Sequence, residues 1–448
     1  MTRVFALRFE EAGLSPPEAA RKQELFERAE AALVDRMGTP ERDVLRWFVP
    51  GRIEIFGKHT DYAGGRSLVC ALERGLCLAA VPRDDGILRV TDAVSGATAE
   101  IPLGPVSENR AADWSIYPRT VARRISRNFS GPLAGIEIAF ASDLPRSAGL
   151  SSSSALIVGV FTALATRNRL DDSAAWRGAI RSCEDLAGYL GAVESGRDFG
   201  SLAGEAGVGT FGGSEDHAAI LCCRVGHVSL YSFCPVRLES AIRLPADLAF
   251  VIGVSGIAAE KTGSAQSFYN RASLATVAIL DLWRSATGRA DATLADAVHG
   301  SAEAPERIRE ILRTSSHSSF TADKLLARFE QFLDESERIV PAAAEALALK
   351  DHAALGELAE RSQAGAERGL RNQVPETVEL VRSARALGAV AASAFGAGFG
   401  GSVWALVRSS DAPAFREDWE KSYRRKFPGA KTAECFVTGA GPALIRLS

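Results

Sequence analysis

The sequence predicts a mixed α/β protein of the α+β class, arranged in two lobes. The chain has 448 residues, of which 46% are hydrophobic and 24% charged. These values are ordinary for a globular protein, and the length suits two or three domains. Apolar runs of strand length alternate with longer amphipathic stretches, and the second part of the chain is richer in helical patterns. Residues 235–245, with a proline at each end, mark the expected boundary.

The charge balance and the hydropathy pattern exclude several classes of function. Lys and Arg total 52 against 55 for Asp and Glu, a net charge of −3, which offers no basic surface for nucleic acid or an anionic membrane. Charged residues interrupt every run that approaches the roughly 18 apolar residues of a membrane span. Glu10 and Glu11 lie where a secretory signal would continue apolar. We therefore expect a cytoplasmic protein without nucleic-acid or membrane partners.

The seven cysteines are scattered along the chain. None belongs to a CxxC pair or lies near a histidine at zinc-binding spacing, so a disulfide framework or a metal site is not indicated. We expect buried, reduced thiols.

The first part of the chain begins with a helix and continues with strand and helix patterns. Residues 15–37 place Leu25, Ala29 and Leu33 on one stripe among charges, as in an amphipathic helix. The further elements expected are a strand at 45–49 ending in the Pro50-Gly51 turn, a strand at 68–81, a hairpin at 87–93 and 98–101, a polar connection at 104–118, helices at 119–128 and 151–166, a Gly/Ser loop at 195–213, and a strand pair at 218–222 and 227–233.

The second part opens with a strand at 248–254 and then shows Ala-, Glu- and Arg-rich helical patterns up to residue 387. Strands are expected at 390–393, 402–407 and 433–437. These patterns predict three units: an N-terminal helical extension at 1–40, a first domain at 41–240 and a second domain at 241–448.

A serine-rich segment at residues 144–155, LPRSAGLSSSSA, is the strongest chemical signal. It follows a predicted strand and opens a predicted helix. Gly149 permits close backbone approach, and four serines supply hydroxyls where free amides and the helix dipole favour a phosphate. No Gly-Lys-Ser/Thr follows, so it is not a Walker A loop. A plain serine helix cap is the alternative.

Three further segments combine glycines with polar groups. Residues 395–402, FGAGFGGS, hold four glycines within six residues, more than a simple hairpin loop requires. Residues 50–65 place Lys58, His59 and Asp61 between glycine turns, which suits hydrogen bonds to a polyol. Glu215, Asp216 and His217 follow two glycines and precede the apolar run expected as a strand. This last cluster is either a solvated turn or a carboxylate presented to a cleft.

In combination these segments resemble one family. Residues 51–65 resemble the galactokinase signature, residues 145–155 the GLSSSA phosphate loop of GHMP kinases, and residues 396–401 the GAGFGG motif of the same family. All three occur in the family's order, and the resemblance spans the chain from about Trp47 onward. It implies the two-lobed GHMP kinase fold with the active site in the interlobe cleft.

The resemblance also implies an activity, ATP-dependent phosphoryl transfer to a sugar's anomeric hydroxyl, with Mg²⁺ as cofactor and the sugar and ATP as small-molecule partners. Asp216 lies where galactokinases carry their catalytic aspartate and would accept the proton of the sugar hydroxyl or orient that hydroxyl. Arg52 would hold this carboxylate and the transferring phosphate. The implied ATP-binding residues are Ser147, Ala148, Gly149, Leu150, Ser151, Ser152, Ser153 and Gly398. The implied sugar-binding residues are Lys58, His59, Asp61, Gly213 and Tyr269, and the expected metal ligands are Ser153 and Glu184.

The sequence departs from the galactokinase pattern at several positions. Lys58 replaces the glutamate of GEHTDY, Glu215 and His217 flank Asp216 where Met and Gln are usual, and the Gly/Ser loop before Asp216 is long. A lysine offers three donors and a positive charge, so one hypothesis is a uronic-acid 1-kinase. The alternative is that Lys58 turns away to pair with Glu54 or Glu215, and a neutral sugar still binds.

Two other functions remain open at this point. Some galactokinase relatives are non-catalytic sugar sensors, although Arg52 and Asp216 are both retained here. The wider GHMP group also includes kinases for mevalonate and homoserine, whereas the residues from His59 to Tyr62, HTDY, favour a sugar.

Overall fold

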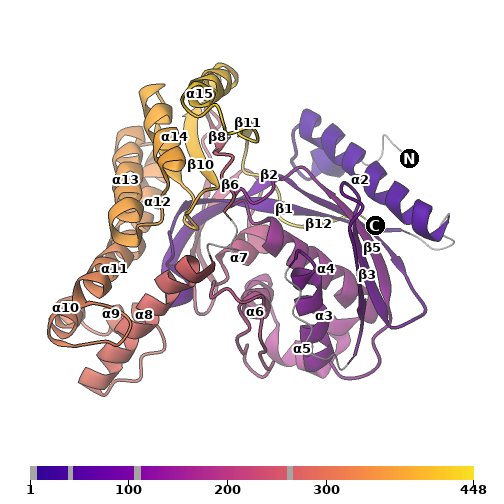
Figure 1. The fold of residues 1–448 in the computed structure, drawn as a ribbon, viewed down its shortest axis with the longest axis horizontal. Helices are drawn as coiled ribbons and strands as arrows, with labels where there is room; N and C mark the ends of the chain where they lie inside the picture. The colour runs from indigo at the N-terminus through magenta and orange to yellow at the C-terminus, as the bar shows by residue number, and fades with distance from the viewer. Residues whose placement is uncertain (1–7, 39–43, 105–112, 260–265, 448) are drawn as a thin grey trace.

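A computed structural model describes residues 8–38, 44–104, 113–259 and 266–447. The chain forms two lobes, each built on its own β-sheet (Figure 1), as the sequence predicts. The beginning of the chain and the middle of the connection expected at 104–118 lie outside the described residues.

The first lobe is built on a sheet with the strand order β12-β1-β2-β5-β3-β4, and β6 joins it by pairing with β2 and with β7. Among the strand pairs of this sheet in the described residues, only β3–β5 is parallel, which fits the α+β class. The strands are β1 (Leu45–Phe56), β2 (Arg66–Pro82), β3 (Ile87–Asp92), β4 (Thr98–Pro102), β5 (Ile136–Ser142), β6 (His227–Ser232), β7 (Arg237–Arg243) and β12 (Ile445–Arg446).

Helices cover both faces of this sheet. On one face α2 (Pro16–Met37) packs on β2 and β5 through its apolar stripe, confirming the predicted N-terminal helix. Figure 1 shows the other helices on the opposite face, with α4 against β1 and β2. These helices are α3 (Ile116–Asn128), α4 (Ser152–Asn168), α5 (Ala174–Ala179), α6 (Cys183–Ser195) and α7 (Glu215–Cys222).

The second lobe has an antiparallel sheet in the order β11-β8-β10-β9. Helices α13, α14 and α15 pack on it, and helices α8 to α11 lie farther from the sheet (Figure 1). The strands are β8 (Leu248–Val254), β9 (Ala391–Ala394), β10 (Ser402–Arg408) and β11 (Glu434–Thr438). The helices are α8 (Gln266–Thr287), α9 (Leu294–His299), α10 (Ala304–Thr314), α11 (Ala322–Asp334), the π-helix η3 (Glu335–Ile339), α12 (Val340–Leu349), α13 (His352–Gly365), the π-helix η4 (Ala366–Leu370), α14 (Pro375–Ala386) and α15 (Ala412–Lys426).

Two local predictions were wrong, and the last strand adds a feature to the predicted domain division. The expected Pro50-Gly51 turn lies inside β1, which continues to Phe56 across a register shift between Pro50 and Arg52. The run expected as a strand at 218–222 is part of helix α7. The last strand, β12, pairs with β1 in the first lobe, so the predicted 241–448 unit returns to the first sheet at its end.

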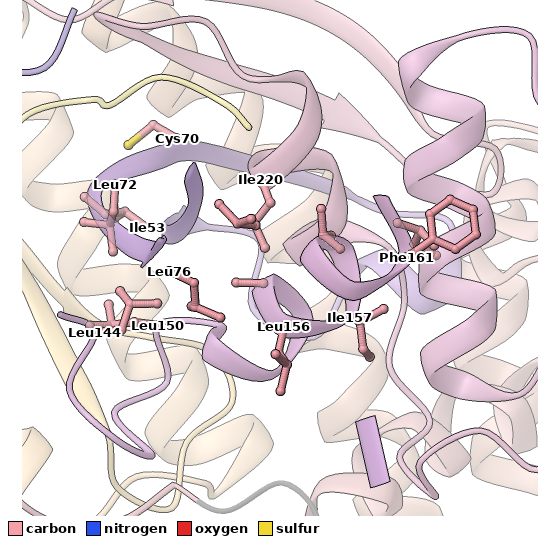
Figure 2. Packing of buried hydrophobic residues seen from close by; sticks show 14 of the residues in the cluster. Ile53, Cys70, Leu72, Leu76, Leu144, Leu150, Leu156, Ile157, Phe161 and Ile220 are labelled. Carbon is pink, nitrogen blue, oxygen red and sulfur yellow. The ribbon is translucent and has the colours of Figure 1, made fainter. Parts of the chain in front are cut away.

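One hydrophobic cluster joins the two lobes. Phe56 of the first sheet meets Trp404 of the second edge-to-face, with ring centroids 5.7 Å apart, and both side chains are fully buried. Figure 2 shows Leu144 and Leu150 of the serine-rich segment beside Leu72 and Leu76 in the same cluster. Burial of an aliphatic side chain contributes about 1.5–3 kcal/mol, so these two leucines anchor the part of the segment that precedes the four serines.

Within the described residues, no helix is long and apolar enough to cross a membrane.

Candidate active site

A partly open pocket lies between the lobes. Its walls come from β1, from the turn that follows β1, from α6 and α7, and from the Gly-rich turn before β10. The lining residues are Arg52, Glu54, His59, Asp61, Tyr62, Gly191, Glu194, Ser195, Thr210, Gly212, Gly213, Glu215, Asp216, His217, Tyr269, Gly396 and Ala397.

Arg52 is the buried cation of this pocket and links its two sides. It lies in β1 with its side chain 2% exposed, and its Nε donates to Asp216 Oδ1 at 2.7 Å. Its Nη1 donates to the carbonyl of Gly149 at 2.7 Å, so one side chain connects the predicted catalytic aspartate with the serine-rich loop. Burial lowers the pKa of Arg52, but the carboxylates of Asp216, Glu215 and Glu54 outweigh it and raise that pKa above its ordinary value.

Asp216 lies in the first turn of α7, two residues after the N-cap residue Ser214. Its second oxygen, Oδ2, is 3.2 Å from the hydroxyl of Ser154. Arg52 and Ser154 thus hold both carboxylate oxygens in position at the pocket wall. A carboxylate fixed in this way can accept a hydrogen bond from a substrate hydroxyl and orient it, which is the geometric requirement for a general base.

Two further carboxylates, Glu54 and Glu215, lie beside Arg52 at 3.7 Å and 3.6 Å. Both are buried, and their side chains are within hydrogen-bonding reach of each other. Burial raises the pKa of Glu215 well above its usual range, and the neighbouring carboxylates add to this. Burial likewise raises the pKa of Glu54, although Arg52 and Lys58 oppose the shift. One guanidinium does not neutralise Asp216 and the two buried carboxylates together, so this group favours retaining a proton.

The oxygens best placed for a divalent cation belong to Ser154 and Glu194. The hydroxyl of Ser154 is 2.8 Å from Glu194 Oε2, and His217 Nε2 lies 3.2 Å from the same oxygen. A hydroxyl and a carboxylate are hard oxygen ligands of the kind that Mg²⁺ combines with phosphate oxygens and water. No group of three or more His, Cys, Asp or Glu side chains in the described chain is arranged to hold a metal by itself, so the fit requires a phosphate ligand as well.

The structure does not bring together the two metal ligands expected from the sequence, Ser153 and Glu184. Glu184 lies in the first turn of α6, ten residues before Glu194 on the same helix, which separates them by about 15 Å. Ser153 is half-buried next to Ser154, but the contacts to Glu194 and Asp216 belong to Ser154.

The serine-rich loop lies where the sequence predicts a phosphate site, at the start of α4. Ser151 Oγ is buried and has no hydrogen-bond partner in the described chain, and a side chain added at Gly149 would meet nothing within 4 Å. The first amides of a helix have no partner within it. The start of α4 thus combines a hydroxyl without a partner, free backbone amides and open space. These features together fit the binding of a phosphate.

The second lobe contacts the serine-rich loop through two hydrogen bonds. Ala259 N donates to Ser147 O at 2.7 Å, and Ser402 Oγ donates to Ala148 O at 2.7 Å. Of the predicted ATP-binding residues, Ser147 and Ala148 therefore make interlobe contacts through their carbonyls. Leu150 is buried in the core, and Ser152 and Ser153 are half-buried in the first turn of α4.

Gly398 is not among the residues that line the pocket. A Cβ at this position would lie 2.3 Å from Asn372 O, and φ is +70°, so the glycine is needed for close packing of the turn. Gly396 and Ala397 form the pocket wall instead. A Cβ on Gly396 would lie 2.3 Å from Glu54 Oε1, which leaves no room for a larger residue between this turn and the carboxylate.

Four of the predicted sugar-binding residues meet at the other end of the pocket: His59, Asp61, Gly213 and Tyr269. The His59 and Tyr269 rings are 5.1 Å apart. Asp61 Oδ2 accepts from the amide of Glu215 at 3.1 Å, and a Cβ on Gly213 would lie 2.3 Å from the same oxygen. Gly213 therefore permits the signature turn to approach the start of α7.

Lys58 does not line the pocket, which contradicts its expected contact with the sugar. Its side chain is fully buried, and Nζ donates to Ser362 Oγ at 2.7 Å and to Ser393 Oγ at 2.9 Å. Ser362 in turn donates to Glu335, which also accepts from the Lys58 amide. We call Lys58, Glu335, Ser362 and Ser393 the Lys58 layer. Lys58 turns away, as the alternative proposed, but its partners are hydroxyls rather than Glu54 or Glu215.

Glu54, Glu194 and Ser154 belong to the site and were not predicted from the sequence. Glu54 follows Arg52 by two residues in a strand, so it faces the same side, and that spacing could have identified it. Glu194 could not be distinguished from Glu184 without the packing of α6. The start of α7 carried a readable signal, a serine followed by two acidic residues, which is typical of a helix N-terminus.

Known proteins resemble this chain over most of its length. The domain described as "Galactokinase galactose-binding signature" matches residues 34–82, "GHMP kinases N terminal domain" matches 117–197, and "GHMP kinases C terminal" matches 343–425. A galactokinase from Roseiflexus sp. (strain RS-1) is 29% identical over 406 residues, covering 89% of this chain and 92% of that protein. A galactokinase from Streptomyces coelicolor is 27% identical, covering 84% and 88%.

Among solved structures, a Lactococcus lactis galactokinase complexed with galactose superposes with a TM-score of 0.74. It is 21% identical and covers 93% of this chain and 98% of that one. This likeness shows that the two chains share a fold.

Proposed function

Since the chain belongs to the GHMP kinase superfamily and carries its galactokinase signature, we propose that it transfers the γ-phosphate of ATP to the anomeric hydroxyl of galactose or a closely related neutral sugar. The observation that carries this proposal is the contact between Arg52 and Asp216 at the wall of the interlobe pocket. The serine-rich loop lies on one side of that contact, and His59, Asp61 and Tyr269 lie on the other.

In the proposed reaction Asp216 orients the acceptor hydroxyl and takes its proton at a carboxylate oxygen. Arg52 holds that carboxylate and keeps its positive charge at every physiological pH, so it can also balance charge on the phosphoryl group. The serine-rich loop and the start of α4 bind the ATP phosphates. Most of the rate enhancement in phosphoryl transfer comes from such positioning and charge balance.

Ser154 and Glu194 would hold Mg²⁺. When bound there with ATP, the ion would neutralise part of the phosphate charge. Ser154 also contacts Asp216, so this hydroxyl couples the position of the proposed base to that of the nucleotide.

The lining of the pocket favours a neutral sugar over a uronic acid. Besides Asp216, the carboxylates of Glu54, Asp61, Glu194 and Glu215 line it, while Lys58 lies outside. A sugar carboxylate would meet like charges and gain no bond to Lys58, and like-charge juxtaposition is unfavourable. We therefore expect galactose to bind more tightly than galacturonate.

A non-catalytic sugar sensor is the remaining alternative, and it would need neither the Arg52–Asp216 contact nor the hydroxyl–carboxylate pair beside it. We also propose a cytoplasmic location, the compartment that supplies ATP and keeps thiols reduced.

The test is a thermal-shift panel of hexoses and hexuronic acids with ATP and Mg²⁺, followed by an ADP-release assay on the sugars that bind. The proposal predicts ADP release with galactose or another neutral hexose and none without sugar. A folded protein that binds the sugar but releases no ADP would favour the sensor.

A further inference from the structure

Helices α6 and α7 pack side by side in the first lobe (Figure 1), and two contacts show that they run in opposite directions. Near the pocket, a Cβ on Gly191 of α6 would lie 2.4 Å from Ser214 Oγ, at the start of α7. Eight residues before Gly191 is Cys183, and eight residues after Ser214 is Cys222. Because both helices rise by about 1.5 Å per residue, this register places the two cysteines opposite each other at the far end of the pair.

The side-chain contacts agree with that register. The sulfur of Cys183 donates to Leu221 O at 3.2 Å, the carbonyl of the residue directly before Cys222, so the two cysteines are near neighbours. Cys183 is exposed and Cys222 is partly exposed. The expectation of uniformly buried thiols is therefore wrong at these two positions and at Cys234, which is also exposed.

We propose that Cys183 and Cys222 form a redox-active thiol pair, which a peroxide converts to a disulfide and a dithiol reduces again. Both thiols are free in the structure. In a reducing compartment, a pair that can form a disulfide is usually a transient, redox-sensing one.

The chemistry needs only the two thiols and hydrogen peroxide. The thiolate of Cys183 attacks one peroxide oxygen, so that the O–O bond breaks, an S–O bond forms and hydroxide leaves as water with the thiol's proton. The sulfur of Cys222 then attacks the sulfenic sulfur. The S–S bond forms as the S–O bond breaks, and a second water leaves with the proton of Cys222. Two thiols are oxidised by two electrons, and one peroxide is reduced to two waters.

The disulfide would enclose the segment that builds much of the pocket. The chain between Cys183 and Cys222 contains Glu194, the Gly/Ser loop and Asp216. A cross-link restricts the unfolded chain by closing a loop, and this stabilises the folded state. Oxidation should therefore raise the melting temperature. The disulfide itself would lie at the end of the two helices that is remote from the pocket.

The test treats the full-length protein with hydrogen peroxide, blocks free thiols with N-ethylmaleimide and maps cysteine peptides by mass spectrometry. We expect a Cys183–Cys222 peptide lighter by two hydrogens, which dithiothreitol separates. The Cys183→Ser and Cys222→Ser variants should lack it, and Cys234→Ser, which removes an exposed thiol outside the pair, should retain it.

Any of three results would overturn the proposal. Cys183 remains unreacted after peroxide treatment, or it is oxidised to sulfinic or sulfonic acid while Cys222 still reacts with N-ethylmaleimide. In the third, Cys183 forms a disulfide with a different cysteine. A melting temperature that rises on oxidation of the native protein but not of Cys222→Ser supports loop closure. A cross-linked protein with an unchanged melting temperature contradicts that part of the proposal.

Discussion

Arg52 and Lys58 are two buried cations six residues apart, and they stabilise different regions. Arg52 lies in the pocket wall against Asp216, Glu215 and Glu54. Lys58 lies in the Lys58 layer, where its ammonium group donates to two serine hydroxyls. Both residues belong to the signature at 51–65, yet their side chains point to different parts of the molecule. The pocket uses its cation on carboxylates that can act on a substrate, whereas the Lys58 layer uses its cation to join the signature turn to the second lobe.

The backbone explains the difference. Arg52 and Glu54 alternate within β1 and so share a face, but β1 ends at Phe56. Gly57 follows with φ of +115°, and a Cβ there would lie 2.2 Å from Ser67 Oγ. This turn directs Lys58 toward α13 and β9 while His59 enters the pocket.

The comparison predicts the largest loss of turnover at the pocket, in Asp216→Asn. An amide does not take up the sugar's proton, so kcat should fall by about 10²-fold or more. Galactose binding should survive because the amide retains nearly the same shape. Steady-state ADP release and a sugar thermal shift measure the two quantities. A kcat close to that of the native protein would contradict the role of Asp216 and direct attention to Glu215.

The next largest effect is expected for Glu194→Gln, with Glu184→Gln as the matched control on the same helix. Loss of a carboxylate ligand should raise the Mg²⁺ concentration needed for half-maximal activity by at least about tenfold, since even indirect ligand supports contribute about 10- to 100-fold. The control should leave the Mg²⁺ dependence unchanged. The reverse result would restore the metal ligand expected from the sequence.

Lys58→Met should affect stability rather than choice of sugar. The substitution removes the buried ammonium group and the two hydrogen bonds that it donates. The free energy of unfolding, measured in urea titrations, should therefore fall by about 2–4 kcal/mol. The ratio of kcat/KM for galactose to that for galacturonate should not change. A tenfold shift of that ratio would show that Lys58 reaches the sugar.

The smallest effect is a change in the pH dependence of stability at Glu215. Because burial raises the pKa of Glu215, the folded protein retains a proton that the unfolded chain releases near pH 4.3. The retained proton contributes fully to the free energy of unfolding below that pH, and this contribution is lost as the pH rises through the pKa of Glu215 in the folded protein. Between pH 5 and pH 8 the native protein should therefore lose more stability than Glu215→Gln does.

Melting temperatures across this pH range measure the difference. Glu24→Gln, an exposed carboxylate on α2, is the control and should follow the native curve. A Glu215→Gln curve parallel to the native one would contradict the retained proton.

The sequence predicted the parts of the fold and site that are encoded locally. The serine-rich loop, the long helices and the strands of the second sheet each depend on one continuous segment with a clear pattern, and the structure confirms those elements. The eight-residue helix α7 was mistaken for a strand because a short apolar run shows no period. Glu194 and the direction of Lys58 depend on packing between distant segments, which one sequence does not reveal.

³¹P NMR of the native protein with galactose, ATP and Mg²⁺ tests the proposed reaction most directly. We expect one new phosphate-ester signal, coupled to the anomeric proton of the sugar, together with ADP. The same protein with Asp216→Asn should form that product at least about 100-fold more slowly. Phosphate on another hydroxyl, or no sugar phosphate from a protein that binds both ATP and galactose, would contradict the central claim that Arg52 and Asp216 direct phosphoryl transfer to the anomeric oxygen.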